Sequence, residues 1–348
     1  KQIVLYIKIM LLSKFRPVNT FTRNLLNSRN LLNSRNLLNS RNLLSTRNLL
    51  NTRNLLNTRN LLNTRCINTT PNSLISPKKF DTVVSKLRSF FHKKGFGEAH
   101  TQNRLSILAA CEDPFTISTY NFGGEVWPLP QTGQMWLEYE LLKNPEYKGL
   151  FCLSTSFRNE PNPIPGRHDK IFPMFEFEMH GGLDEMIQME AELLEHLGFQ
   201  DNNGFPSATY DELCKKYNTQ ELEHEHEQKL KDDHGSVFFI RDFPEYTSPF
   251  WNMARYPGGD VSKKVDVIVN GIETIGSAER SCDAKDMEQR FHTISDGDYS
   301  KTLFSGFTKE RVENELEDFL RFKFFPRSGG GIGITRLISG MEENGLLK

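Results

Sequence analysis

The chain has 348 residues, 37% of them hydrophobic and 25% charged, which is an ordinary composition for a globular protein. Its near-neutral net charge conceals an asymmetry, because residues 1–80 carry fourteen Lys or Arg and no acid, leaving 29 basic and 44 acidic residues in the remainder. This acidic remainder excludes a general affinity for nucleic acid, no apolar run approaches the ~20 residues of a membrane span, and five scattered cysteines indicate a reducing compartment.

The first organised feature is a hexapeptide, Arg-Asn-Leu-Leu-Asn-Ser or a close variant, repeated seven times from Arg23 to Thr64. A six-residue period turns about 600° on a helix, so the leucine pairs fall on three separate stripes and form no continuous apolar face. We therefore expect residues 1–75 to be a disordered, low-complexity tail. Its acid-free, Arg-rich composition also suits a mitochondrial presequence beginning at Met10. The alternatives are a cytoplasmic protein and an expanded repeat without function.

From residue 80 the pattern becomes helical. Six apolar side chains recur at i, i+3, i+4, i+7, i+10 and i+11, which predicts an amphipathic helix that ends near Gly95. They are Phe80, Val83, Val84, Leu87, Phe90 and Phe91. We expect this helix to face the core and to contribute to a dimer interface.

A polar turn then leads into a second predicted helix within residues 129–138. It carries Gln131, Gln134 and Glu138, and the last two share a face because they lie four residues apart. Ordinary surface polarity is the alternative explanation for these three side chains.

Two strand-like segments flank the stretch Phe157-Arg158-Asn159-Glu160. Residues 153–156 precede it, and residues 171–180 follow after a loop that contains three prolines. In the second segment Phe and Met alternate with Glu and His, which predicts a half-buried strand and a hairpin.

Charged side chains gather at the loop of this hairpin. Arg158 and Glu160 point the same way on an extended chain because they are two residues apart. The loop holds Arg167 and His168 close to them. Positive charge here suits a phosphate, and the glutamate can accept from an amino group. The alternative is a cross-strand ion pair on a solvated sheet.

Residues 183–197 predict another amphipathic helix, and residues 219–235 read as a charged surface insertion. The next strand, Val265–Val269, ends in Asn270-Gly271, the strongest two-residue hairpin signal. If that turn forms, Asp266 and Glu273 meet diagonally on one face of the sheet. Two neighbouring carboxylates repel unless a cation lies between them, which predicts a Mg²⁺ site.

The last motif is the glycine-rich run from Gly329 to Gly333, followed by Arg336. Glycines such as Gly331 and Gly333 let the backbone approach a ligand closely, and the following residues predict a helix with Arg336 on its first turn. The run is not a dinucleotide fingerprint, because Arg336 stands where the third glycine would be.

Taken in order, three motifs resemble those of the catalytic core of class II aminoacyl-tRNA synthetases of the Asp/Asn/Lys subgroup. They are Phe-Arg-x-Glu at residues 157–160, Asp-x6-Glu-x6-Arg from Asp266 to Arg280, and Gly-x-Gly-x-x-Arg ending at Arg336. The resemblance covers about residues 78–340. It implies an α+β fold, with an antiparallel sheet flanked by helices, in a catalytic domain at residues 76–348. It also implies a ligase that joins an amino acid to ATP as an aminoacyl-adenylate, with ATP and Mg²⁺ as cofactors.

The resemblance also implies a role for each motif residue. Arg158 would hold the α-phosphate, Glu160 would meet the adenine or the ammonium group, and Arg167 or His168 would reach the γ-phosphate. Phe172 would stack on adenine beneath Arg336. Asp266 and Glu273 would carry Mg²⁺. The implied ATP-binding set is Arg158, Glu160, Arg167, His168, Phe172, Gly331, Gly333 and Arg336, with Arg158 and Arg336 as the catalytic pair.

The amino acid is indicated by two further positions. Arg280 matches the family's arginine for the substrate side chain, and Gln134 with Glu138 is similar to the asparaginyl form, in which the glutamate accepts from the carboxamide. Leu137 stands where aspartyl enzymes and asparagine synthetase relatives tend to have lysine. These residues favour asparagine or another uncharged polar amino acid over aspartate as the substrate. The resemblance also implies tRNA as the acceptor and a homodimer as the assembly.

Three departures keep alternatives open. Gln102 stands where the family's first motif closes with proline, Ile171 replaces the acid before the stacking aromatic, and the residues before Phe80 do not resemble the anticodon-binding barrel. One alternative is a free-standing aspartate–ammonia ligase. The other is a catalytically silent paralogue that serves as a binding module.

Overall fold

The computed structural model describes residues 75–164, 169–200 and 203–347. The expected tail through residue 74 and the predicted ligands Arg167 and His168 lie outside the described residues. The described residues belong to one compact unit, Pro71–Lys348, and no helix among them is long and apolar enough to cross a membrane.

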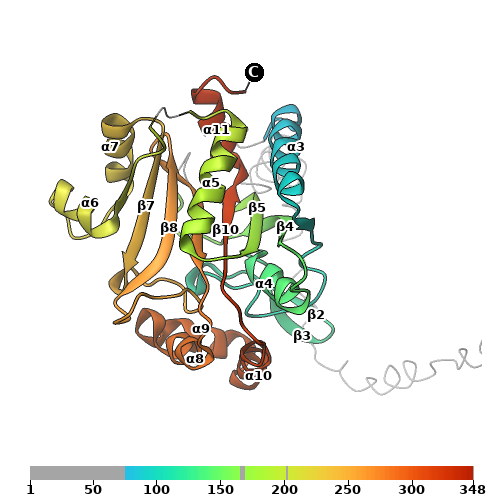
Figure 1. Cartoon of the computed structure of the whole chain (residues 1–348). Helices are drawn as coiled ribbons and strands as arrows, with labels where there is room; N and C mark the ends of the chain where they lie inside the picture. The colour runs from blue at the N-terminus through green and yellow to red at the C-terminus, as the bar shows by residue number, and fades with distance from the viewer. Residues whose placement is uncertain (1–74, 165–168, 201–202, 348) are drawn as a thin grey trace, which may run out of the picture. The chain divides into compact units, whose positions relative to one another are not determined.

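An eight-stranded sheet organises the described part of the chain, in the order β1-β4-β5-β10-β9-β8-β7-β6 (Figure 1). Only its two outermost pairs, β1–β4 and β6–β7, are parallel. The predicted antiparallel sheet flanked by helices is therefore confirmed. The strands are β1 Gly97–Glu98, β4 Gly149–Phe157, β5 Ile171–His180, β6 Ser207–Thr209, β7 Val237–Pro244, β8 Val261–Val269, β9 Ile272–Glu279 and β10 Arg327–Gly333; β2 Thr119–Phe122 and β3 Glu125–Pro128 form a separate hairpin.

Three helices cover one face of the sheet: α3 (Pro77–Lys94), α5 (Leu183–Leu197) and α11 (Ile334–Glu343) (Figure 1). Phe91 of α3 lies at the centre of this core, with its ring centroid 5.2 Å from that of Phe175 and 5.4 Å from that of Phe177. The helices predicted at residues 80–91 and 183–197 are confirmed. Gly95 ends α3 with a left-handed φ of 85°, as its position predicted.

The middle of β5 is covered on the opposite face too, so the strand predicted to be half-buried at residues 171–180 is buried on both faces at residues 175–178. Helix α4 (Gln134–Lys143) packs on β4 and β5 through Leu137 and Leu141. Because of this cover, Glu176 and Glu178 of β5 are fully buried. The remaining helices are α6 Tyr210–Tyr217, α7 His224–His234, α8 Ala284–Thr293, α9 Asp298–Phe307 and α10 Lys309–Leu320.

Both predicted hairpins form. Asn270 and Gly271 adopt φ angles of 50° and 77°, and Val269 pairs with Ile272 as the two-residue turn required. The register shifts once between β8 and β9, next to Val267, so that Asp266 lies opposite Gly276. The β4–β5 hairpin closes at Phe157 and Ile171, and Arg158 and Glu160 follow directly after β4.

Two local backbone features concern the motif positions. The glycine run forms strand β10, at the centre of the sheet between β5 and β9. Gln102, where the family's motif usually has proline, has a φ of 60°. Proline is locked near −65°, so it could not adopt this local conformation.

Candidate active site

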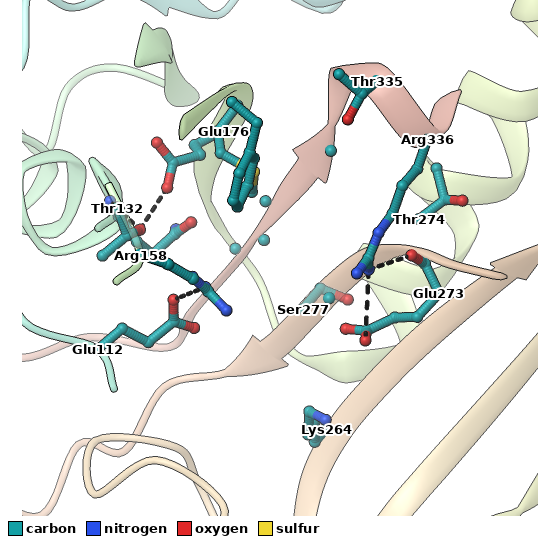
Figure 2. Close-up of a pocket in the computed structure, with 18 of the residues that line it drawn as sticks. Glu112, Thr132, Arg158, Glu176, Lys264, Glu273, Thr274, Ser277, Thr335 and Arg336 are labelled. Carbon is teal, nitrogen blue, oxygen red and sulfur yellow. Dashed lines mark hydrogen bonds and ion pairs between the residues drawn. The ribbon is translucent and has the colours of Figure 1, made fainter. Parts of the chain in front are cut away.

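A cavity of about 360 Å³ lies over β5, β10 and β9, within the size range of small-molecule sites (Figure 2). Segments that are far apart in the sequence meet around it. The predicted residues that line it are Gln134, Arg158, Glu160, Phe172, Glu273, Arg280, Gly331, Gly333 and Arg336. Asp266 and Glu138 are not among the lining residues.

Arg158 is held at the mouth of the β4–β5 hairpin. Its N–H donates to Lys170 O over 2.8 Å, and its Nη2 donates to Glu112 Oε2 over 2.5 Å. The charge of Glu112 raises the pKa of Arg158. Gln131 lies before α4, not on the predicted helix, and its Oε1 accepts from the N–H of Glu112 over 2.8 Å, which fixes the Glu112 loop.

Arg336 enters the cavity from the first turn of α11, as predicted, and Figure 2 shows it on the side opposite Arg158. Its Nη1 donates to the carbonyl oxygen of Glu273 over 2.7 Å and lies 3.8 Å from Glu273 Oε2. The two arginines therefore approach one space from separate elements. Each is paired with a partly exposed glutamate, which a more strongly charged ligand can replace.

Asp266 and Glu273 come together on the cavity face, with Asp266 Oδ1 at 3.6 Å and Glu273 Oε1 at 3.2 Å from the position of a Cβ on Gly276. Lys264 also faces them, and its Nζ donates to Asp266 Oδ2 over 2.7 Å. Burial by itself lowers the pKa of Lys264, but the charges of Asp266 and Glu273 outweigh burial and raise it.

This arrangement is compatible with a Mg²⁺ ion that Asp266 and Glu273 would hold. One oxygen of Asp266 accepts from Lys264, and the other, Oδ1, is buried without a hydrogen-bond partner among the described residues and lies near the same point over Gly276 as Glu273 Oε1. Mg²⁺ binds through one or two carboxylates and keeps several water ligands.

The inner end of the cavity is a buried charge network. Arg280 lines the cavity and donates Nη2 to Glu178 Oε2 over 3.2 Å. Arg327 donates Nη2 to Glu138 Oε2 over 2.8 Å, and both side chains are 0% exposed. Burial raises the pKa of Glu178 above its ordinary range, although the charge of Arg280 opposes this.

Gln134 is positioned for this end by the start of α4. Its Nε2 donates to Phe177 O over 2.8 Å and to Glu178 Oε2 over 2.5 Å. Glu176 secures the helix N-terminus, because its carboxylate accepts the Gly133 N–H over 2.8 Å. Gly329 leaves the necessary room, since a Cβ there would lie 2.0 Å from Glu178 Oε2.

A family model described as tRNA synthetases class II (D, K and N) matches residues 62–345. The chain belongs to this family.

Among curated relatives of this class II synthetase chain, an aspartate–tRNA(Asp) ligase of Thermoplasma acidophilum is 22% identical over 277 residues, which cover 72% of this chain and 61% of the relative. An asparagine–tRNA ligase of Desulforamulus reducens is 25% identical over 284 residues, which cover 72% of this chain and 62% of the relative. The fold is similar to that of Pyrococcus horikoshii asparaginyl-tRNA synthetase complexed with asparaginyl-adenylate, with a TM-score of 0.63 and 22% identity. The match covers 76% of this chain and 64% of that synthetase. The chain thus spans about three fifths of the length of these relatives.

Two of the class II residues predicted for the amino acid are placed differently from expectation. Glu138 does not face the cavity, because Arg327 and Asn252 occupy its two carboxylate oxygens. Leu137 points away from the cavity and packs with Leu141 and Leu150. Neither side chain lines the cavity.

Sequence reasoning missed five residues that hold this class II site together: Glu112, Glu176, Glu178, Lys264 and Arg327. Glu176 and Glu178 could have been noticed in the sequence, because they alternate with phenylalanines in β5. Carboxylates in such a strand need buried polar partners once both faces of the strand are covered. Lys264 could have been found from its i, i+2 spacing to Asp266. Glu112 and Arg327 had no local pattern, since their partners are 46 and 189 residues away.

Proposed function

We propose that the protein is a class II ligase that activates asparagine with ATP, forms asparaginyl-adenylate and transfers the amino acid to tRNA. The observation that carries this proposal is the convergence of three arginines from separate segments on one cavity. Arg158 comes from the β4–β5 hairpin, Arg280 from the end of β9 and Arg336 from α11.

The outer end of the cavity suits the triphosphate. In the proposed step, a carboxylate oxygen of the amino acid bonds to the α-phosphorus, the bond to the bridging oxygen of the β-phosphate breaks, and pyrophosphate leaves. Negative charge grows on the phosphorus oxygens in the transition state. The fixed charges of Arg158 and Arg336 stabilise that charge by about 3 kcal/mol each. Phe172 offers a face for adenine, and Glu160 an acceptor for an amino group.

The inner end suits an uncharged polar side chain. With Glu138 and Glu178 ionised, their charges cancel those of Arg280 and Arg327, so a third buried carboxylate would be unbalanced. Nε and Nη2 of Arg280 donate to Glu178, and its Nη1 has no hydrogen-bond partner among the described residues. This donor suits a carboxamide oxygen. The asparaginyl enzymes among the relatives support the same choice.

The names of the curated relatives support tRNA as acceptor. Ammonia, the acceptor in an aspartate–ammonia ligase, is the alternative to be tested beside it. We further propose that the protein acts as a homodimer, which sedimentation velocity on the purified chain would establish.

Amino-acid-dependent exchange of [³²P]pyrophosphate into ATP tests the proposal. We expect exchange with asparagine, and less with aspartate or lysine at equal concentration. Exchange driven best by aspartate would keep the adenylate chemistry but change the substrate. No exchange with any amino acid would overturn the proposal and leave a silent paralogue. Adding tRNA or ammonium to an active preparation then identifies the acceptor.

A further inference from the structure

The inner end of the cavity has an apolar side chain that the proposed function does not use. Met253 lies in the segment between β7 and β8, and it lines the cavity. It is partly exposed, and among the described residues it belongs to none of the four hydrophobic clusters. Its thioether is therefore not part of the core and is available to a ligand in the cavity.

Met253 is the direct neighbour of the arginine proposed to hold the substrate side chain. The two residues form an isolated antiparallel bridge, with Met253 opposite Arg280, and both line the cavity. Partners across such a bridge present their side chains on the same face, with Cβ atoms about 5 Å apart. A side chain whose oxygen binds Arg280 must therefore end close to Met253.

Hydrogen bonds fix the backbone of this segment on both sides of the bridge. The N–H of Ser281 donates to Asn252 O, and the N–H of Ala254 donates to Glu279 O, each over 2.8 Å. These two bonds join the segment to the residues directly before and after the arginine. The place of Met253 relative to that arginine is thus set by the fold.

A buried guanidinium group also supports the segment. The Arg255 side chain is 4% exposed, and its Nη1 donates to Met253 O over 2.6 Å and to Phe250 O over 3.0 Å, while its Nη2 donates to Pro249 O over 2.9 Å. Hydrogen bonds from a charged donor are the stronger kind. The backbone therefore resists retreat before a longer ligand, and only the flexible methionine side chain can give way.

We propose that Met253 is a specificity residue that limits the length of the amino-acid side chain. Its thioether closes the inner end beside Arg280, so a side chain longer by one methylene group, as in glutamine, can bring its carboxamide oxygen to Arg280 only by displacing the methionine. One methylene group without room costs an enzyme ~10- to 200-fold in discrimination. The inference deepens the proposed function and rests on it, because it assumes that Arg280 holds the side-chain oxygen.

The ratio of kcat/KM for asparagine to kcat/KM for glutamine, measured by pyrophosphate exchange on the full chain, tests the inference. We expect the wild type to favour asparagine at least ~10-fold. Met253→Ala removes the side chain beyond Cβ, and we expect this ratio to fall at least ~10-fold because glutamine gains. Met253→Leu nearly conserves the volume and should keep the ratio within ~3-fold of the wild type.

Met174→Ala is the matched control, because it makes the same substitution elsewhere in the same cavity. Met174 lies on β5 four residues before Glu178, the partner of Arg280, which places it about 13 Å away along the strand. Any loss of exchange in this variant should fall on both amino acids alike, so that the ratio stays that of the wild type. An equal gain with glutamine in Met174→Ala would mean that a loosened cavity causes it, and would overturn the inference.

The inference and the proposed function can fail separately. If the wild type exchanges with asparagine and folded Met253→Ala keeps its ratio, Met253 does not limit the length and the inference alone falls. Should Met253→Ala not fold, Met253→Val answers the same question, with a fall in the ratio of at least ~3-fold expected. If aspartate drives the wild type best, aspartate and glutamate are the pair to compare, and the same fall is expected. No exchange with any amino acid removes both proposals.

Discussion

The two ends of the cavity use the same pair of residue types, arginine and glutamate, in opposite ways. At the outer end, Arg158 and Glu112 are 30% and 47% exposed, whereas at the inner end Arg327 and Glu138 are both 0% exposed. An exposed pair gains little from its mutual attraction, so a phosphate can replace the glutamate at low cost. A buried pair cannot be separated without leaving a charge in the protein interior. The outer end is therefore suited to exchange ligands, and the inner end to fix the shape of the pocket.

The largest effect on stability is expected when one partner of the buried pair at the inner end is removed. Arg327→Leu leaves Glu138 buried without its main partner, and we expect the free energy of unfolding in urea to fall by about 3–5 kcal/mol. The matched control is Arg321→Leu, because Arg321 forms a pair of similar length with Glu317 that is fully on the surface, 2.7 Å against 2.8 Å. Its loss should stay within about 1 kcal/mol. Equal losses in the two variants would contradict the comparison.

The next largest effect concerns the outer end and is expected in catalysis, not in stability. Arg158→Ala and Arg336→Ala should each lower pyrophosphate exchange at least ~100-fold, because each removes a fixed cation from the developing charge. Both variants should unfold at nearly the same urea concentration as the wild type. Exchange like that of the wild type in both would show that the phosphates bind elsewhere.

A buried carboxyl group that has no arginine partner shows what the pairing of Glu138 with Arg327 prevents. Glu190 of α5 is 0% exposed, and burial raises its pKa from 4.5 to about 8, although an interaction with the Ser277 side chain opposes this shift. The unfolded chain releases this proton near pH 4.5 and the folded chain only near pH 8, so stability falls as the pH rises through this window. We expect Glu190→Gln to abolish this loss, which amounts to about 3.5 kcal/mol between pH 5 and pH 8. Urea unfolding at several pH values measures it, and parallel profiles of variant and wild type would refute it.

The smallest effect is expected for the exposed glutamate itself. Glu112→Gln removes the partner of Arg158 at the outer end, and the free energy of unfolding should change by less than about 1 kcal/mol. ATP affinity, followed by calorimetric titration, should not fall, because the phosphate no longer competes with a carboxylate for Arg158. A marked loss of stability would show that this pair belongs to the scaffold.

Local patterns in the sequence were enough to predict the hairpin at Asn270-Gly271 and the helices α3 and α5. The meeting of Arg158, Arg280 and Arg336 was predicted from the resemblance of three short, ordered motifs to those of a known family. Local patterns were not enough for the inner end. Burial of Glu178 depends on α4 covering β5, and the partner of Glu138 lies 189 residues away, so neither follows from spacing along the chain. The expected place of Glu138 in the pocket was wrong for the same reason.

The most direct test of the account is a calorimetric titration with a non-hydrolysable sulfamoyl analogue of asparaginyl-adenylate, since this one molecule must reach both ends of the cavity. The account predicts that Arg158→Ala and Arg280→Met each weaken binding of this analogue at least ~100-fold relative to the wild type. If the analogue binds both variants as tightly as the wild type, or does not bind the wild type, the two ends do not form a single adenylate site.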